Sequence, residues 1–199
     1  MGTRHLTCVV KDGEFKVAQY GQWDGYPSGQ GMTCLEFLQN WNRNQFSDRI
    51  DACIPCNKDE IQAFCESIGS TNGWMNLEQS KKFKFKYPQL SRDMGADILN
   101  FIANSTEPVE LDYAVEFAGD GLFCEWVWVI DLDKNTFECY GGCNKNGPLP
   151  ENERFAFLNE KQGNNDYCPP LLKASWSLDS LPSKEQFLKD CEVNDEEEV

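Results

Sequence analysis

LFCEWVWVIDL, residues 122–132, carries apolar side chains at almost every position. Successive side chains of a strand point to opposite faces of its sheet. An apolar residue at nearly every position therefore predicts a central strand that is covered on both faces. The segment 111–117 before it alternates apolar and polar residues, and 137–140 follows the turn 133–136. We predict an antiparallel β-meander over residues 111–141.

The first part of the chain predicts a second hairpin, over residues 4–20. Apolar and polar residues alternate there, and Asp12-Gly13 is typical of a two-residue turn. Helices are expected to begin at Thr33, Asn57, Ser91 and Ser183, where a capping residue precedes an apolar face, with a short helix at 151–160. The fold class is therefore α+β, with antiparallel sheet packed against helices, and an αββα sandwich is one arrangement that fits.

Charge and length set the expected partners and domain organisation. The chain has 199 residues and a net charge of −15, and the last ten residues carry six acidic side chains and no basic one. We expect a single domain over 1–191 and a disordered acidic tail over 192–199. An acidic chain repels nucleic acid and anionic membranes, so we expect neither as a partner.

Lysine and aromatic residues alternate in the segment Lys81–Tyr87. This pattern predicts an extended edge strand with lysines guarding its outer face. A basic patch for phosphate is the alternative.

Ten cysteines and the absence of an apolar leader indicate a cytoplasmic protein with reduced thiols, without cofactor or metal. Two close pairs, Cys53 with Cys56 and Cys139 with Cys143, leave a four-thiolate zinc site as an alternative.

Segment Gln19–Gly31 (QYGQWDGYPSGQG) is the strongest candidate for a functional loop. It follows a predicted strand, precedes a predicted helix, and combines glycines, aromatics and amides without any aliphatic side chain. Glycines permit close backbone approach, and Trp and Tyr offer flat surfaces with a polar group. We predict that it binds a small ligand or a protein partner. The predicted ligand-binding residues are Arg4, Gln19, Tyr20, Gln22, Trp23, Asp24 and Tyr26. A structural loop that plugs the end of the sheet is the alternative.

Few residues suggest catalysis. His5 is the one histidine, and we expect it to face solvent or cap the sheet. Asp24 lies in the loop, and Glu125 lies within the most apolar strand, where a carboxylate needs a partner; Arg4, Arg92 or Arg154 is the expected ion-pair partner. Asp24 and Glu125 are weak catalytic candidates.

The start Met-x-Thr-Arg and the motif Trp23-Asp24-Gly25-Tyr26 before a helix resemble a group of small uncharacterised phage and bacterial proteins, and the longer run 17–27 resembles hypothetical fungal proteins. Neither resemblance implies an activity. The order of hairpin, helices and meander is also similar to N-terminal-nucleophile hydrolases. That resemblance implies an amide hydrolase with Thr3 as nucleophile, although Met1 and Gly2 precede it.

Overall fold

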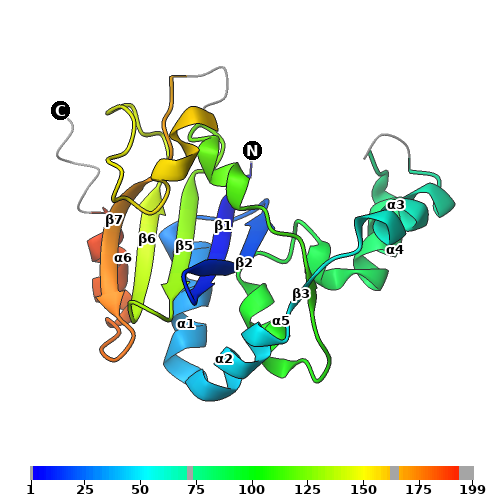
Figure 1. Cartoon of the computed structure of the whole chain (residues 1–199), viewed down its shortest axis with the longest axis horizontal. Coiled ribbons are helices and arrows are strands. Elements are labelled where there is room, and N and C mark those ends of the chain that lie inside the picture. The colour runs from blue at the N-terminus through cyan, green and yellow to red at the C-terminus, as the bar shows by residue number, and fades with distance from the viewer. Residues whose placement is uncertain (1, 71–73, 162–165, 193–199) are drawn as a thin grey trace.

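The computed structural model describes residues 2–70, 74–161 and 166–192 (Figure 1). It confirms the α+β class: a five-stranded sheet packs against helices. The predicted acidic tail, apart from Glu192, lies outside the described residues.

The main sheet combines two hairpins and one further strand in the order β2-β1-β5-β6-β7. β1 and β5 run parallel, whereas the other neighbours are antiparallel. The strands are β1 (His5–Lys11), β2 (Glu14–Gly21), β5 (Trp126–Asp131), β6 (Thr136–Gly141) and β7 (Leu171–Ser177). β5 occupies the middle of the sheet, as its apolar pattern predicts. Because the described residues form this single large sheet, they do not make the two stacked sheets of an αββα sandwich.

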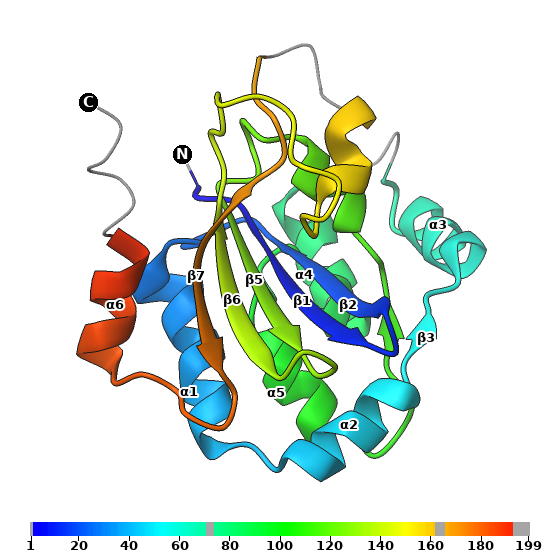
Figure 2. The same cartoon turned by 60° about the vertical axis from the view of Figure 1, so that its left-hand side comes forward.

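Helices cover one face of the sheet, and shorter helical turns cover the other (Figure 2). The first face packs on α1 (Met32–Asn40), α2 (Arg43–Asp51), α5 (Asp97–Asn104) and α6 (Lys184–Glu192). The opposite face packs on the 3₁₀ segments η3 (Val115–Gly119) and η4 (Ala156–Lys161). On β5, Trp128 faces the helices and Val127 faces the 3₁₀ segments, so both faces of this strand are buried.

A separate arm extends from the sheet at the right of Figure 1. It consists of α3 (Lys58–Ser67) and α4 (Leu77–Lys86), followed by the 3₁₀ turn η2 (Pro88–Leu90). A parallel ladder of β3 (Ile54–Pro55) and β4 (Glu110–Leu111) lies at its base.

Several local predictions are confirmed. Asp12 and Gly13 adopt positive φ in the β1–β2 turn. The Asn57 side chain caps α3, and the Ser183 hydroxyl accepts from the backbone N–H of Gln186 at the start of α6. These signals act over a few residues, so they do not depend on the rest of the fold.

The predicted edge strand at Lys81–Tyr87 is wrong, because this segment belongs to α4 and its C-cap. A capping box between Asn76 and Gln79 starts the helix. Phe83 and Tyr87, four residues apart, come together with ring centroids 5.5 Å apart, as neighbours on one helical face do. Phe83 is half-buried and Phe85 is exposed, so the alternation of Lys and Phe in the sequence does not reflect a strand with one buried face.

Three helix predictions and one strand prediction need correction. Thr33 lies inside α1 and does not cap it, because the short helical turn η1 (Pro27–Gly31) precedes the helix. The helix expected from Ser91 begins at Asp97, after a left-handed Gly95. The helix expected at 151–160 is the 3₁₀ segment η4. The first strand of the predicted meander is instead the two-residue β4 and η3.

Among the residues with assigned positions, we find no helix whose length and apolar character would let it cross a bilayer.

Candidate functional site

The loop after β2 is fixed to its surroundings by backbone hydrogen bonds. The N–H of Gly25 donates to the Thr3 carbonyl at 2.9 Å, and the N–H of Gln30 donates to the Asp24 carbonyl at 2.8 Å. The N–H of Gln22 donates to the Arg92 carbonyl at 2.9 Å. The loop is thereby tied both to the N-terminal strand and to the segment between η2 and α5.

Glycines let this loop lie directly on the central strand. A Cβ at Gly31 would come within 2.5 Å of the Trp128 ring, and one at Gly29 within 2.2 Å of the Asp24 carbonyl oxygen. Trp128 also donates from its indole Nε1 to the Gly25 carbonyl at 2.9 Å. Larger side chains at the two glycines would push the loop away.

Five side chains from three segments gather where β1 begins and β2 ends. We call this group the sheet-end cluster; it comprises Arg4, Tyr20, Gln22, Trp23 and Arg92. The Tyr20 hydroxyl donates to Gln22 Oε1 at 2.7 Å. The Trp23 indole is 44% exposed, and the Arg92 guanidinium lies 6.0 Å from its ring centroid. The Arg4 guanidinium stacks over the ring of Phe123 at 4.2 Å.

Both guanidinium groups of the cluster lack an ion pair. No carboxylate in the described ranges lies within ion-pairing distance of Arg4 or Arg92, and the buried Arg4 Nε has no hydrogen-bond acceptor. The nearby Asp93 is already engaged, because it accepts from Lys84 Nζ at 3.0 Å and from Trp23 Nε1 at 3.1 Å. Burial raises the pKa of Tyr20, while the charges of Arg4 and Arg92 oppose that rise. The two cations therefore act on the same hydroxyl.

The structure brings together four of the seven predicted ligand-binding residues, and Arg92 joins them unpredicted. Asp24 and Tyr26 lie further along the loop, where the Tyr26 hydroxyl donates to Asp24 Oδ1 at 3.1 Å. Gln19 lies elsewhere: it is buried on the opposite face of β2 and donates to the Tyr20 carbonyl. Adjacent residues of a strand point to opposite faces, so Gln19 and Tyr20 do not share a surface.

The weak catalytic candidates form no joint arrangement. Thr3 contributes its backbone carbonyl to the loop, and Asp24 holds a left-handed turn with φ of 57°. Glu125 Oε1 accepts from the backbone N–H of Arg4 at 3.1 Å. Within the described part of the chain it pairs with none of the arginines proposed for it; Arg154 instead binds Asp131 and Glu138.

His5 is fully buried, so the expectation of a solvent-facing histidine is wrong. Its ring fits against glycines: a Cβ at Gly21 or Gly95 would come within 2.0 or 3.1 Å of a ring atom. Neither ring nitrogen has a hydrogen-bond partner, nor does the buried Oγ1 of Thr7 on the same face. Burial lowers the pKa of His5 to about 4, against the opposing effects of the Thr3 backbone and the Asp24 charge. The ring is therefore neutral at physiological pH.

The cysteines proposed for zinc have different environments. Cys139 is buried, Cys143 is exposed, and Cys53 and Cys56 are half-buried at the two ends of β3. Over the ranges with assigned positions, no group of three or more His, Cys, Asp or Glu side chains is arranged to hold a metal ion.

We expect Cys143 to react fastest with a thiol reagent such as DTNB, because it is the exposed one of the ten cysteines. Buried thiols are protected by lack of access, and burial also raises the pKa of Cys8 to about 12. A time course in native buffer should show one fast thiol, which Cys143→Ser removes, while Cys8→Ser leaves it. A fast thiol that persists in Cys143→Ser would contradict this assignment.

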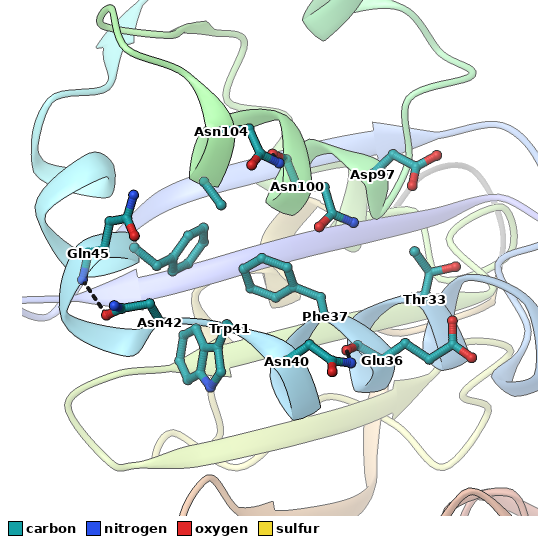
Figure 3. Close-up of a pocket in the computed structure, with 12 residues that line it drawn as sticks. Thr33, Glu36, Phe37, Asn40, Trp41, Asn42, Gln45, Asp97, Asn100 and Asn104 are labelled. Atoms are coloured by element: carbon teal, nitrogen blue, oxygen red, sulfur yellow. Dashed lines mark hydrogen bonds between the residues drawn. The ribbon is translucent and has the colours of Figure 1, made fainter.

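A groove of about 590 Å³ lies between α1, α2 and α5, with Phe37 and Trp41 along its floor and amide side chains around its rim (Figure 3). Helix ends account for most of these amides. Asn42 caps α2, and Asn40 and Asn104 each donate to a carbonyl of their own helix. The groove therefore follows from the meeting of helix termini, and we do not assign a ligand to it.

The sheet-end cluster thus combines cations without ion pairs among the described residues, a polar hydroxyl–amide pair and an exposed indole. No protein-family model, curated protein or solved structure matches this chain.

Proposed function

We propose that the protein binds a small anionic ligand, a carboxylate or phosphate attached to a planar apolar group, at the sheet-end cluster. One observation carries the proposal: the sheet-end cluster holds two guanidinium groups, of Arg4 and Arg92, that have no ion-pair partner among the described residues, in a chain whose net charge is −15. Two described carboxylates lie beside the cluster, but neither forms an ion pair with these guanidinium groups: Asp93 accepts from Trp23 and Lys84, and Glu125 accepts from the backbone N–H of Arg4. An external anion would supply the missing acceptor.

The chemistry of the cluster matches such a ligand. Guanidinium groups present forked N–H donors that fit carboxylate and phosphate oxygens. The Trp23 indole, already 44% exposed and held by its bond to Asp93, offers a flat surface for a planar group. Backbone bonds fix the loop before any ligand arrives, so little ordering is needed on binding.

We expect phenyl phosphate or benzoate to bind wild-type protein more tightly than inorganic phosphate does, as measured by isothermal titration calorimetry. Arg4→Gln and Arg92→Gln should each weaken phenyl phosphate binding by about tenfold or more, since hydrogen bonds to charged groups contribute about 1.5–3 kcal/mol. Trp23→Ala should weaken phenyl phosphate and leave inorganic phosphate nearly unchanged, because it removes only the flat surface.

Lys134→Gln is the matched control. It removes one exposed positive charge at the opposite end of the β5–β6 hairpin, and it should leave affinity unchanged. Equal weakening by Lys134→Gln and Arg92→Gln would reduce the effect to net charge and contradict the site. Binding of none of the three anions by folded wild-type protein would also reject the proposal.

We place this activity in the cytoplasm as part of the same proposal. Ten cysteines, six of them buried, are compatible with a reducing compartment. The six are Cys8, Cys34, Cys124, Cys139, Cys168 and Cys191.

A further inference from the structure

The α3–α4 arm exposes large apolar side chains on α4. Phe85 is 92% exposed and Leu77 is 74% exposed, and both lie on α4. They are eight residues apart, with Lys81 midway, so the three residues share one side of the helix. Single exposed apolar residues are common, but several on one helix face mark an interaction site.

Phe85 borders a groove between the two helices of the arm, whereas Leu77 lies on the same side of α4 outside the groove lining. The groove has a volume of about 520 Å³, and Phe64 and Ile68 from the α3 side line it together with Phe85. Phe64 and Ile68 are only partly buried, so the apolar lining is open to a partner. The arm projects from the sheet (Figure 1).

Lysines surround the apolar lining. α4 carries four of the eighteen Lys and Arg residues of the chain within ten positions, against one acidic residue, Glu78. Lys82 pairs with Glu78 at 2.9 Å, and Lys86 lies 4.7 Å from the centroid of the Phe64 ring. Lys81 is exposed and has no ion-pair partner among the described residues. The groove is thus apolar inside and positive at its rim, within a protein that is otherwise strongly acidic.

We propose that this arm groove binds an acidic amphipathic helix of a partner protein. Apolar side chains at helical spacing on the partner would enter between Phe64, Ile68 and Phe85, and flanking Asp or Glu would meet Lys81 and Lys86. The charge of the rim requires an acidic partner, and the length of α4 suits a helix of about three turns.

Two other occupants fit less well. A second copy of the arm would bring the lysines of two α4 helices together, and like charges at an interface oppose binding. An anionic bilayer would attract the lysines of α4, but the acidic body of the protein would repel it.

The test uses full-length protein and a fluorescein-labelled synthetic helix with Leu at i, i+4 and i+8 and Glu at the flanking positions. Fluorescence anisotropy should show saturable binding that weakens as salt is raised. A peptide of the same Leu spacing with Lys in place of Glu should bind at least about tenfold more weakly. Phe85→Ser should weaken binding of the acidic peptide by about tenfold or more, because it removes an apolar contact of the size of a phenyl ring.

Lys81→Glu should weaken binding and flatten its salt dependence. Phe157→Ser, at an exposed phenylalanine of η4 outside the arm, is the control and should leave affinity unchanged. Because Phe85 and Lys81 are exposed, unchanged melting temperatures will show that these variants are folded. Equal binding of the acidic and basic peptides, no effect of Phe85→Ser, or capture by phosphatidylserine vesicles without peptide binding would each overturn the proposal.

Discussion

Arg154→Met is expected to destabilise the protein by about 3–5 kcal/mol, the usual cost of leaving a buried charge without its partner. Arg154 Nη2 lies 2.6 Å from Asp131 Oδ2 and 2.9 Å from Glu138 Oε1, and its Nε lies 2.8 Å from Glu138 Oε2. Side-chain exposure is 9% for the arginine, 2% for Asp131 and 7% for Glu138. Methionine fills much of the same volume but leaves two buried carboxylates facing each other. Urea denaturation at neutral pH measures the loss.

A second variant separates the two possible causes of this loss of stability, the uncompensated carboxylates and the changed packing. The triple variant Arg154→Met, Asp131→Asn, Glu138→Gln keeps the new methionine but removes the two uncompensated charges, so it should recover more than half of the lost stability. Arg49→Met is the control. Arg49 is a partly exposed residue of α2 that makes one long hydrogen bond, to the Thr106 carbonyl, so its replacement should change stability by about 0.5 kcal/mol or less. A triple variant no more stable than Arg154→Met would assign the loss to packing.

This buried network also shows what the sequence alone could predict. Asp131 lies near the end of the most apolar strand, and the sequence indicates a hairpin turn over residues 133–136, which the structure confirms between β5 and β6. Nothing within the hairpin identifies Arg154 as the partner of Asp131 and Glu138. Arg154 comes from a later segment that packs on the sheet face covered by the 3₁₀ segments. Local turn chemistry is readable from neighbouring residues, whereas this ion pair depends on how two distant segments pack.

The same distinction applies to the candidate site. The loop at residues 19–31 stands out by composition, and Arg4, Tyr20, Gln22 and Trp23 do lie together. Arg92 was beyond prediction, because Ser91 resembles a helix cap and the sequence gives no sign that the following residues form an irregular segment. That segment is set by the hydrogen bonds of Gln22 to the Arg92 carbonyl and of the Ala96 N–H to Gln30 Oε1. The burial of His5 likewise depends on Gly95, which is 90 residues away in sequence.

His5 should lower the stability of the folded protein as the pH falls from about 6.5 to about 4. Its pKa is about 4 in the folded protein and about 6.5 when the chain is unfolded. The unfolded state therefore binds more protons between these values, so stability rises with pH across this window and falls as pH drops from about 6.5 to about 4. Integrated over the window, the loss is about 3 kcal/mol.

Carboxylates also titrate near the lower end of this window, so a variant must isolate the contribution of the histidine. Urea denaturation at neutral pH and at about pH 4.5 gives the change in the free energy of unfolding for wild type, His5→Gln and His5→Phe. Neither variant side chain takes up a proton in this range, so wild type should lose about 2–3 kcal/mol more than either variant between the two pH values. The comparison uses only this difference, so a variant that is less stable at every pH still serves.

The wild-type protein offers a direct measurement that needs no variant. Because the chain has one histidine, the imidazole carbon-bound protons give one assignable set of NMR resonances. We expect them to stay at their neutral-form shifts down to about pH 5 and to move only near pH 4, or as the protein unfolds. The physical reason is the environment of the ring: Gly21, Gly25 and Gly95 enclose it, and the cost of burying a charge outweighs the opposing effects of the Thr3 backbone and the Asp24 charge. A midpoint near 6.5 in the folded protein would mean that the ring reaches solvent, and the acid sensitivity assigned to it would then disappear.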